Sequence, residues 1–221
     1  MFVKASNPKT EGLAMKRIYG LVLLTAGLHL CSVAVADGDW YAGLSLGLGE
    51  ANEIGFEDID DGSALSGSID DNDFGWKIYG GYAYNQYVAI EGGYVDLGEV
   101  SINAESDGDG VAYDAGQVTA SIGTTGFSLS VLGLMPINDR LGLHARIGYF
   151  TWKADQRLNN SAFQPVSEDF EGSDPTFGVG AMYKLNDQTT IRVDYEKFAD
   201  VEAVDGSLLS LGLQFHFGAG K

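Results

Sequence analysis

Eight stretches of the chain alternate between apolar and small or polar residues with a period of two, the repeat of a β-strand whose two faces meet different surroundings. In the stretch over residues 207–217, for example, leucine or phenylalanine recurs at every second position. No apolar run reaches the roughly 20 residues that a membrane-spanning helix needs. The eight predicted strands are residues 40–48, 74–84, 87–97, a segment within 117–135, 141–152, 176–185, 189–198 and 207–217.

The connections between these predicted strands alternate between short and long. Short turns are expected at 85–86, 136–140 and 186–188, and long polar connections at 50–73, 98–116, 154–175 and 199–206. An even number of strands of about ten residues, joined in this way, is typical of an outer-membrane barrel. We therefore predict an all-β fold: an eight-stranded antiparallel up-and-down transmembrane β-barrel with short periplasmic turns and long extracellular loops.

A soluble barrel or sandwich is the alternative fold, and it would turn its apolar face inward. The face opposite the apolar one argues against this, because it carries four bases and three acids: Lys77, Glu91, Arg146, Lys184, Arg192, Asp194 and Glu196. An eight-stranded barrel has an interior that side chains can fill, so these ions can pair in the lumen while the apolar face meets lipid. We predict a lumen ion network of these seven residues. It either forms a static polar core or acts as a gate whose partners re-pair.

Tyrosine and tryptophan gather at the ends of the predicted strands, as the interfacial girdles of a membrane barrel require. The residues assigned to these girdles are Trp40, Tyr41, Tyr82, Tyr84, Tyr87, Tyr94, Tyr149 and Trp152.

The N-terminus has the pattern of a secretory signal peptide. Lys16 and Arg17 precede an apolar stretch over 18–31, and Ala34 and Ala36 provide the small residues of a cleavage site. We expect cleavage after Ala36. Lipid attachment at Cys31 is the weaker alternative, because Leu30 stands where that processing needs a small residue. The expected organisation is a mis-assigned extension (1–14), a signal peptide (15–36), a barrel (37–218) and a C-terminal tail (219–221).

The charge balance excludes one large class of partner. The chain has 13 Lys and Arg against 31 Asp and Glu, a formal net charge of -18, so it repels nucleic acid. Most acids fall in the long connections, where Arg157 is the only base. These acids either form a solvated crown or collect divalent cations, which prefer oxygen ligands and could bridge to lipopolysaccharide. They lack EF-hand spacing. We expect no dedicated metal site and no cofactor.

Catalysis is not expected from the histidine pattern. Beyond the signal peptide the chain has only His144 and His216, both predicted to face the periplasmic half of the lumen. A barrel hydrolase needs a histidine with a serine or acidic partner near the outer rim. The sequence offers no such pair, and Ser210 near His216 is a pairing that chance explains.

Three segments resemble one known family. Residues 74–100 (FGWKIYGGYAYNQYVAIEGGYVDLGEV), 140–152 (RLGLHARIGYFTW) and 212–218 (GLQFHFG) are similar to strands two and three, five and eight of the OmpA-like transmembrane domain family. Gly212, Phe215 and Phe217 also resemble the C-terminal signal that the outer-membrane assembly machinery reads, although four residues follow Phe217 here. Many members continue into a peptidoglycan-binding domain. This chain stops at Lys221, so we do not expect cell-wall tethering.

The resemblance implies export to the outer membrane of a Gram-negative bacterium. The implied partners are membrane lipid, lipopolysaccharide and the assembly machinery, and the expected state is a monomer. We expect a non-enzymatic protein that contributes to envelope integrity and surface interactions. A low-conductance porin-like channel for ions or small solutes is the alternative, and a lipid-modifying enzyme is a distant one.

Overall fold

The computed structural model describes residues 38–52, 59, 62–70, 72–111, 113–160, 166–201 and 204–217. Its strands are β1 (Asp39–Asn52), β2 (Leu65–Asp70), β3 (Asn72–Asn85), β4 (Val88–Ser106), β5 (Gly116–Pro136), β6 (Leu141–Asn160), β7 (Val166–Lys184), β8 (Thr189–Val201) and β9 (Val204–His216). Within these residues no helix is long and apolar enough to cross a membrane. The predicted extension, signal peptide, cleavage site and tail lie outside the described residues.

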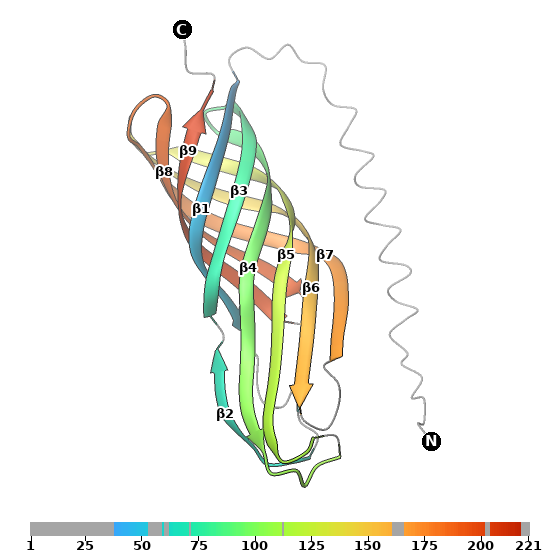
Figure 1. Ribbon diagram of the computed structural model, residues 1–221. Helices are drawn as coiled ribbons and strands as arrows, with labels where there is room; N and C mark the ends of the chain where they lie inside the picture. Colours follow the sequence, from blue (N-terminus) through green and yellow to red (C-terminus); the bar gives the residue numbers. More distant parts are fainter. Residues whose placement is uncertain are drawn as a thin grey trace. The chain divides into compact units, whose positions relative to one another are not determined.

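Eight of the strands form a closed antiparallel ring in the order β1, β3, β4, β5, β6, β7, β8, β9 and back to β1 (Figure 1). The first and last strands close it, with Tyr41 opposite His216. Each ring strand is therefore paired with a neighbour on both sides around the ring, the condition for crossing lipid with strands. The predicted eight-stranded antiparallel fold is confirmed. β2 is an additional strand, which pairs with the far part of β4.

Three short turns lie together at one end of the ring, which we call the turn end. Each contains an asparagine whose side-chain oxygen accepts backbone N–H groups, the Asx geometry that favours tight turns. Asn85 accepts from Val88 at 2.9 Å, Asn138 from Leu141 at 2.9 Å, and Asn186 from Gln188 at 2.9 Å. These turns lie where the sequence predicts them.

The opposite end, which we call the loop end, differs from the prediction. β4 continues to Ser106, β5 starts at Gly116, β6 runs to Asn160 and β7 starts at Val166, so most of two predicted long loops is strand. Together with β2 these strands extend beyond the ring as a sheet (Figure 1). The sequence pattern hid this because strands outside lipid need no apolar outer face. Their alternation places polar residues outside and apolar residues inside, the reverse of the pattern used to find the spanning strands.

The extension has a small core of its own. Its buried apolar residues are Ile59, Ile102, Ala104, Tyr113, Val118 and Ala120. The Tyr113 hydroxyl donates to the Ile59 carbonyl at 2.9 Å. Where the ring passes into the extension, β4 has a bulge between Asp96 and Glu99, and the Glu99 N–H donates to the Asp73 side chain at 2.8 Å. Gly98 adopts a φ of 85° there, a conformation that glycine readily allows.

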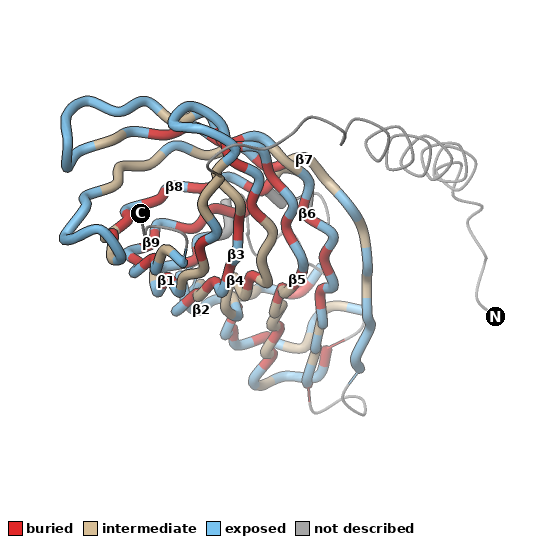
Figure 2. Tube along the Cα trace, turned by 90° about the horizontal axis from the view of Figure 1, so that it is seen from above, coloured by how far each residue is buried: buried red, intermediate tan, exposed pale blue. Residues whose placement is uncertain are grey.

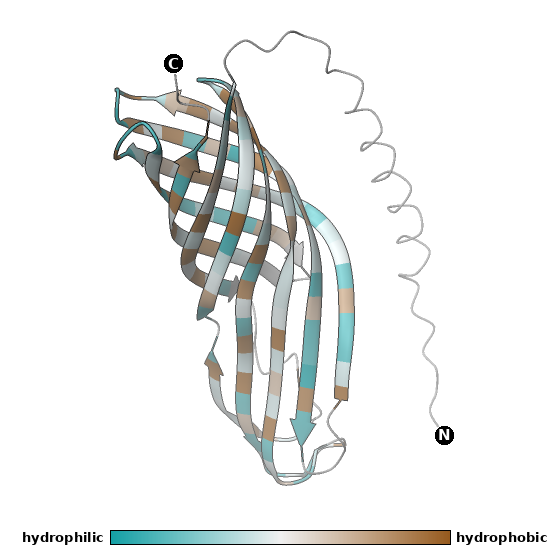
Figure 3. Cartoon of the chain, turned by 45° about the horizontal axis from the view of Figure 1, so that its top comes forward, coloured by the Kyte–Doolittle hydropathy of each residue, from teal (hydrophilic) through white to brown (hydrophobic). Residues whose placement is uncertain are grey.

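Along β1 the two faces of the ring separate apolar from small or polar residues as predicted. On β1, Leu44, Leu46 and Leu48 point outward, with 48% to 60% of their surface exposed, whereas Ser45 is buried inside. Figure 2 shows buried and exposed residues alternating along the strands, and Figure 3 shows the matching alternation of hydropathy.

The aromatic girdle needs two corrections. Trp40, Tyr84, Tyr87 and Tyr149 are exposed on the outside, as predicted; Tyr82 and Tyr94 are half-buried; Tyr41 and Trp152 are buried within the barrel. The reason is the strand repeat itself. Tyr41 follows an outward residue, and Trp152 is an odd number of residues beyond the outward Tyr149, so both point inward.

Candidate functional site in the barrel lumen

Six ionic side chains lie together inside the ring, and we call them the ionic layer: Lys77, Glu91, Arg146, Arg192, Asp194 and Glu196. They come from β3, β4, β6 and β8, and each is at most 4% exposed. Three positive and three negative charges balance within one buried volume. Because an uncompensated buried charge is costly, this balance is a condition for the layer to exist.

Glu91 is the carboxylate that joins all three cations. It lies 2.9 Å from Arg146 Nη1, 2.7 Å from Arg192 Nη1 and 3.3 Å from Lys77 Nζ. The Tyr41 hydroxyl also donates to it, at 3.2 Å. Removal of Glu91 would therefore take away the nearest acceptor of Arg146, Arg192 and the Tyr41 hydroxyl.

The other two carboxylates complete the layer. Glu196 contacts Lys77 at 2.9 Å and Arg146 at 3.1 Å. Asp194 contacts Arg192 at 3.0 Å and Arg146 at 3.2 Å, and a single oxygen of it also meets His144 Nε2 at 2.6 Å. His144 was predicted to face the lumen, but the sequence did not reveal its place beside Asp194.

Lys184 is the one residue of the predicted network that the structure places elsewhere. It is the last residue of β7, its side chain is 47% exposed, and it pairs with Asp187 at 3.0 Å in the following turn. Lys184 does belong to the inner face of β7, but it lies at the mouth of the barrel. Solvent there removes any need for a buried partner.

Glycines opposite the large lumen side chains provide the space that these occupy. A Cβ on Gly178 would lie 2.9 Å from Arg146 Cγ, and one on Gly180 would overlap the His144 ring. Gly212, named above for its resemblance to an assembly signal, points inward, where a Cβ would overlap the Ser45 side chain. Phe215 and Phe217 of the same motif point outward and are exposed.

A second filling lies next to the ionic layer, toward the loop end, and we call it the apolar layer: Val95, Phe150, Trp152, Ala154, Phe198 and Leu208. The Phe150 and Phe198 ring centroids are 4.7 Å apart, and Trp152 Nε1 donates to Asp174 at 2.9 Å. Sequence reasoning missed this layer because it assigned apolar residues to the lipid face. The alternation within the predicted strands does indicate this layer, since Phe198 lies two residues beyond the inward Glu196 and therefore points inward as well.

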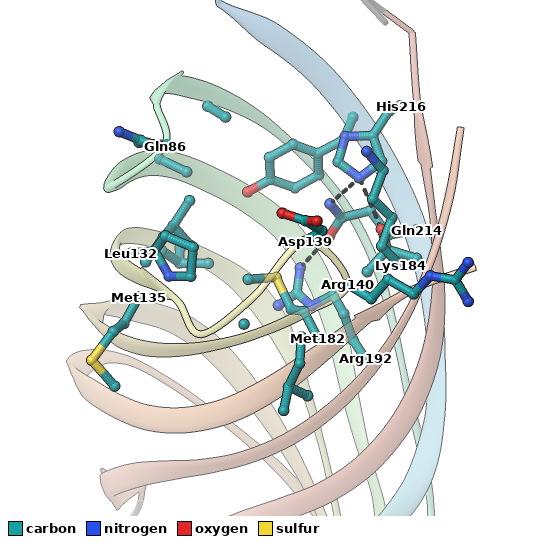
Figure 4. Close-up of a pocket in the computed structure, with 18 of the residues that line it drawn as sticks. Gln86, Leu132, Met135, Asp139, Arg140, Met182, Lys184, Arg192, Gln214 and His216 are labelled. Atoms are coloured by element: carbon teal, nitrogen blue, oxygen red, sulfur yellow. Dashed lines mark hydrogen bonds between the residues drawn. The ribbon is translucent and has the colours of Figure 1, made fainter. Parts of the chain in front are cut away.

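A cavity of about 210 Å³ opens at the turn end. Figure 4 shows Gln214 and His216 beside Arg192 of the ionic layer, joined by dashed hydrogen bonds, with Leu132 and Met182 among the apolar lining. Among the described residues no group of three or more His, Cys, Asp or Glu side chains is arranged to hold a metal ion.

A model of the OmpA-like transmembrane domain matches residues 35–221. The chain belongs to the OmpA-like transmembrane domain family. Outer membrane protein A of Shigella flexneri is 27% identical over 207 residues, which are 90% of this chain and 55% of that protein. Its counterpart in Salmonella typhi is 28% identical over 204 residues, 89% of this chain and 53% of that protein. The chain thus spans little more than half the length of these curated relatives.

Solved structures share the fold. The structure of Neisserial surface protein A has a TM-score of 0.51 at 13% identity, covering 82% of this chain and 100% of that one. OprG from Pseudomonas aeruginosa has a TM-score of 0.50 at 12% identity, covering 80% of this chain and 95% of that one. The predicted location in the outer membrane of a Gram-negative bacterium is confirmed by the family. The turn end is the periplasmic end, and the extension lies outside the cell.

Proposed function

We propose that this protein is a closed, non-conducting barrel whose main role is to support envelope integrity and to present a folded surface outside the cell. The observation that supports the proposal is that two layers of side chains fill the lumen. The ionic layer occupies the periplasmic half, and the apolar layer lies beyond it, with Phe150, Phe198 and Leu208 each 0% exposed. This role needs no catalytic group.

The competing role is a low-conductance channel gated by re-pairing within the ionic layer. Glu91 already contacts three cations, so alternative pairings are available. Re-pairing alone, however, would leave the apolar layer in place. Packed aromatic and aliphatic side chains offer no partners to a hydrated ion.

The test is single-channel recording in planar bilayers, with the unaltered protein beside the double variant Arg146→Ala and Arg192→Ala. We expect no openings in either, because neither substitution opens the apolar layer. A third variant, Phe150→Ala and Phe198→Ala, tests that layer separately. Discrete openings in the unaltered protein, widened by the double arginine substitution, would replace the structural role with the channel.

A cell-level measurement tests the envelope role directly. Cells lacking the protein should become more permeable to a large hydrophilic antibiotic or to detergent, and the unaltered gene should restore resistance. The non-conducting double arginine variant should restore it to the extent that it is stably inserted. Unchanged permeability in the deletion would contradict the integrity role.

The outer surface supports a further part of the proposal, a divalent-cation link to lipopolysaccharide. Exposed acids on the extension include Glu105, Asp107, Asp155, Glu168, Asp169 and Glu171. Arg157 there already faces Glu99 at 3.6 Å. We expect millimolar Ca²⁺ to slow proteolysis of the extension in lipopolysaccharide vesicles. Equal cleavage with Ca²⁺ and with EDTA would contradict this link and favour a solvated acidic crown.

A further inference from the structure

Three polar side chains at the periplasmic mouth lie in a row across β1, β9 and β8. The row includes the seam of the barrel, the place where the first strand, β1, pairs with the last strand, β9. Asp39 is the first residue of β1, Thr190 the second of β8 and His216 the last of β9. His216 Nδ1 lies 2.5 Å from Asp39 Oδ2, and His216 Nε2 lies 3.2 Å from Thr190 Oγ1. An acid, an imidazole and a hydroxyl in this order have the arrangement of a general-base relay.

The neighbouring hydrogen bonds determine which nitrogen of His216 carries the proton. Arg192 Nη1 can only donate, so the atom that it meets at 2.8 Å is the Gln214 carbonyl oxygen. The Gln214 amide nitrogen therefore points to His216 Nε2, at 3.1 Å, and donates to it. Nε2 is then the unprotonated nitrogen, and Nδ1–H donates to Asp39. Through Gln214, the ionic layer sets the tautomer that a base needs.

The relay lies where a cavity opens at the periplasmic mouth, and the side chains of His216 and Asp39 are 21% and 31% exposed there. Thr190, Gln214 and His216 all line the cavity of about 210 Å³, together with the apolar side chains of Leu134 and Met182. Thr190 is 6% exposed, so its hydroxyl is shielded by the cavity walls. A nucleophile, a base with the correct tautomer and an apolar recess therefore coincide at a mouth that faces the periplasm.

We infer that this mouth is an acyl-transfer site for small carboxylic esters with an apolar acyl group, an activity additional to the proposed envelope role. Thr190 Oγ1 attacks the ester carbonyl carbon while His216 Nε2 takes the hydroxyl proton. The carbonyl–alkoxy bond then breaks, and the alcohol leaves with that proton.

Water completes the cycle. It attacks the acyl-threonine carbonyl, gives one proton to His216, and the acid is released as Thr190 Oγ1 recovers that proton. Asp39 acts as a positioning residue that holds the imidazole. The Gln214 amide N–H leaves Nε2 when that nitrogen takes the proton, and then donates to the carbonyl oxygen of the ester. The apolar lining of Leu134 and Met182 selects the acyl group.

Two readouts on the full chain in detergent micelles test the site. A fluorophosphonate probe should label Thr190, with the oxygen–phosphorus bond formed as fluoride leaves, and peptide mass mapping should locate the adduct. Hydrolysis of p-nitrophenyl butyrate should be at least ten-fold faster than in Thr190→Ala. Thr190→Ser should keep both properties, and His216→Gln should lose both. Ser210→Ala, which alters a lumen hydroxyl that does not line the cavity, should keep both.

The role of Asp39 requires a separate comparison, because it also joins the first and last strands. Asp39→Asn should slow labelling of Thr190, and Asp39→Glu should restore it, with strand content unchanged by circular dichroism. A correctly folded protein that labels elsewhere, or that hydrolyses the ester no faster than Thr190→Ala, overturns the inference. Neither result would touch the proposed envelope role, which bilayer recording and permeability test independently.

Discussion

The ionic layer and the apolar layer fill neighbouring parts of the same lumen by opposite means. In the ionic layer each side chain depends on named partners, and Glu91 alone meets three cations. In the apolar layer Phe150, Phe198 and Leu208 depend on shape and volume, with non-directional contacts. The comparison teaches that the ionic layer specifies which strands face one another. The apolar layer closes the lumen and tolerates substitution by other apolar side chains of similar volume.

Glu91→Ala should give the largest effect on this contrast. It leaves Lys77, Arg146 and Arg192 facing one acceptor fewer in a buried volume, and loss of one partner of a buried pair costs about 3–5 kcal/mol. The measurement is the free energy of unfolding by urea in lipid vesicles. Glu99→Ala, which alters an exposed acid, is the control. A loss no larger than that of the control would show that the layer is hydrated and weakly coupled.

Arg192→Lys should come next, although it keeps the charge. An ammonium group cannot reproduce the guanidinium that reaches Glu91, Asp194 and Gln214 together. Loss of one hydrogen bond between charged groups corresponds to about 2 kcal/mol of unfolding free energy. Denaturant titration of both proteins provides the number, and equal midpoints would mean that only net charge matters in this layer.

Leu208→Met is the matched exchange in the apolar layer. Both side chains have similar volume and no polar partner is lost, so we expect about 1 kcal/mol or less. The same unfolding assay applies. Should this exchange cost more than Arg192→Lys, the ranking of the two layers would be reversed, and shape rather than pairing would be the stricter requirement.

Lys184→Ala should have the smallest effect. Its pair with Asp187 is solvent-exposed on both sides, and such pairs contribute about 0.5 kcal/mol or less. Repeating the measurement at high salt should leave the difference between the two proteins near zero. A loss comparable to that of Arg192→Lys would place Lys184 back in the network predicted from the sequence.

Period-two alternation was sufficient to predict the ring, because lipid outside and side chains inside impose it on every spanning strand. The same parity placed Lys77, Glu91 and Arg146 in the lumen. It also contained the inward positions of Trp152 and Phe198, which were overlooked because apolar residues were assigned to lipid. The alternation itself places both residues inside; the error lay in the assumption that the lumen holds only small and polar side chains.

Other features were beyond the reach of a single sequence. The extension alternates in the opposite sense, because water meets its outer face and apolar residues such as Ile102 and Ala104 point inward. For this reason β2 and the far ends of β4 to β7 resemble polar loops in the sequence. The contact of His216 with Asp39 and Thr190 depends on the register across the seam, and residues 177 apart in the chain show no local sign of it. Such contacts become visible only when the ring is closed.

The seam between β1 and β9 also has a consequence for synthesis. These strands lie at opposite ends of the ring's sequence, so the ring is incomplete until the last strand has been made. A nascent chain that ended after β8 would bring two unpaired backbone edges into hydrocarbon, at a cost of several kcal/mol per unsatisfied group. Synthesis of β9 must therefore be finished before insertion can be, and its completion sets the earliest moment at which the barrel can enter the membrane.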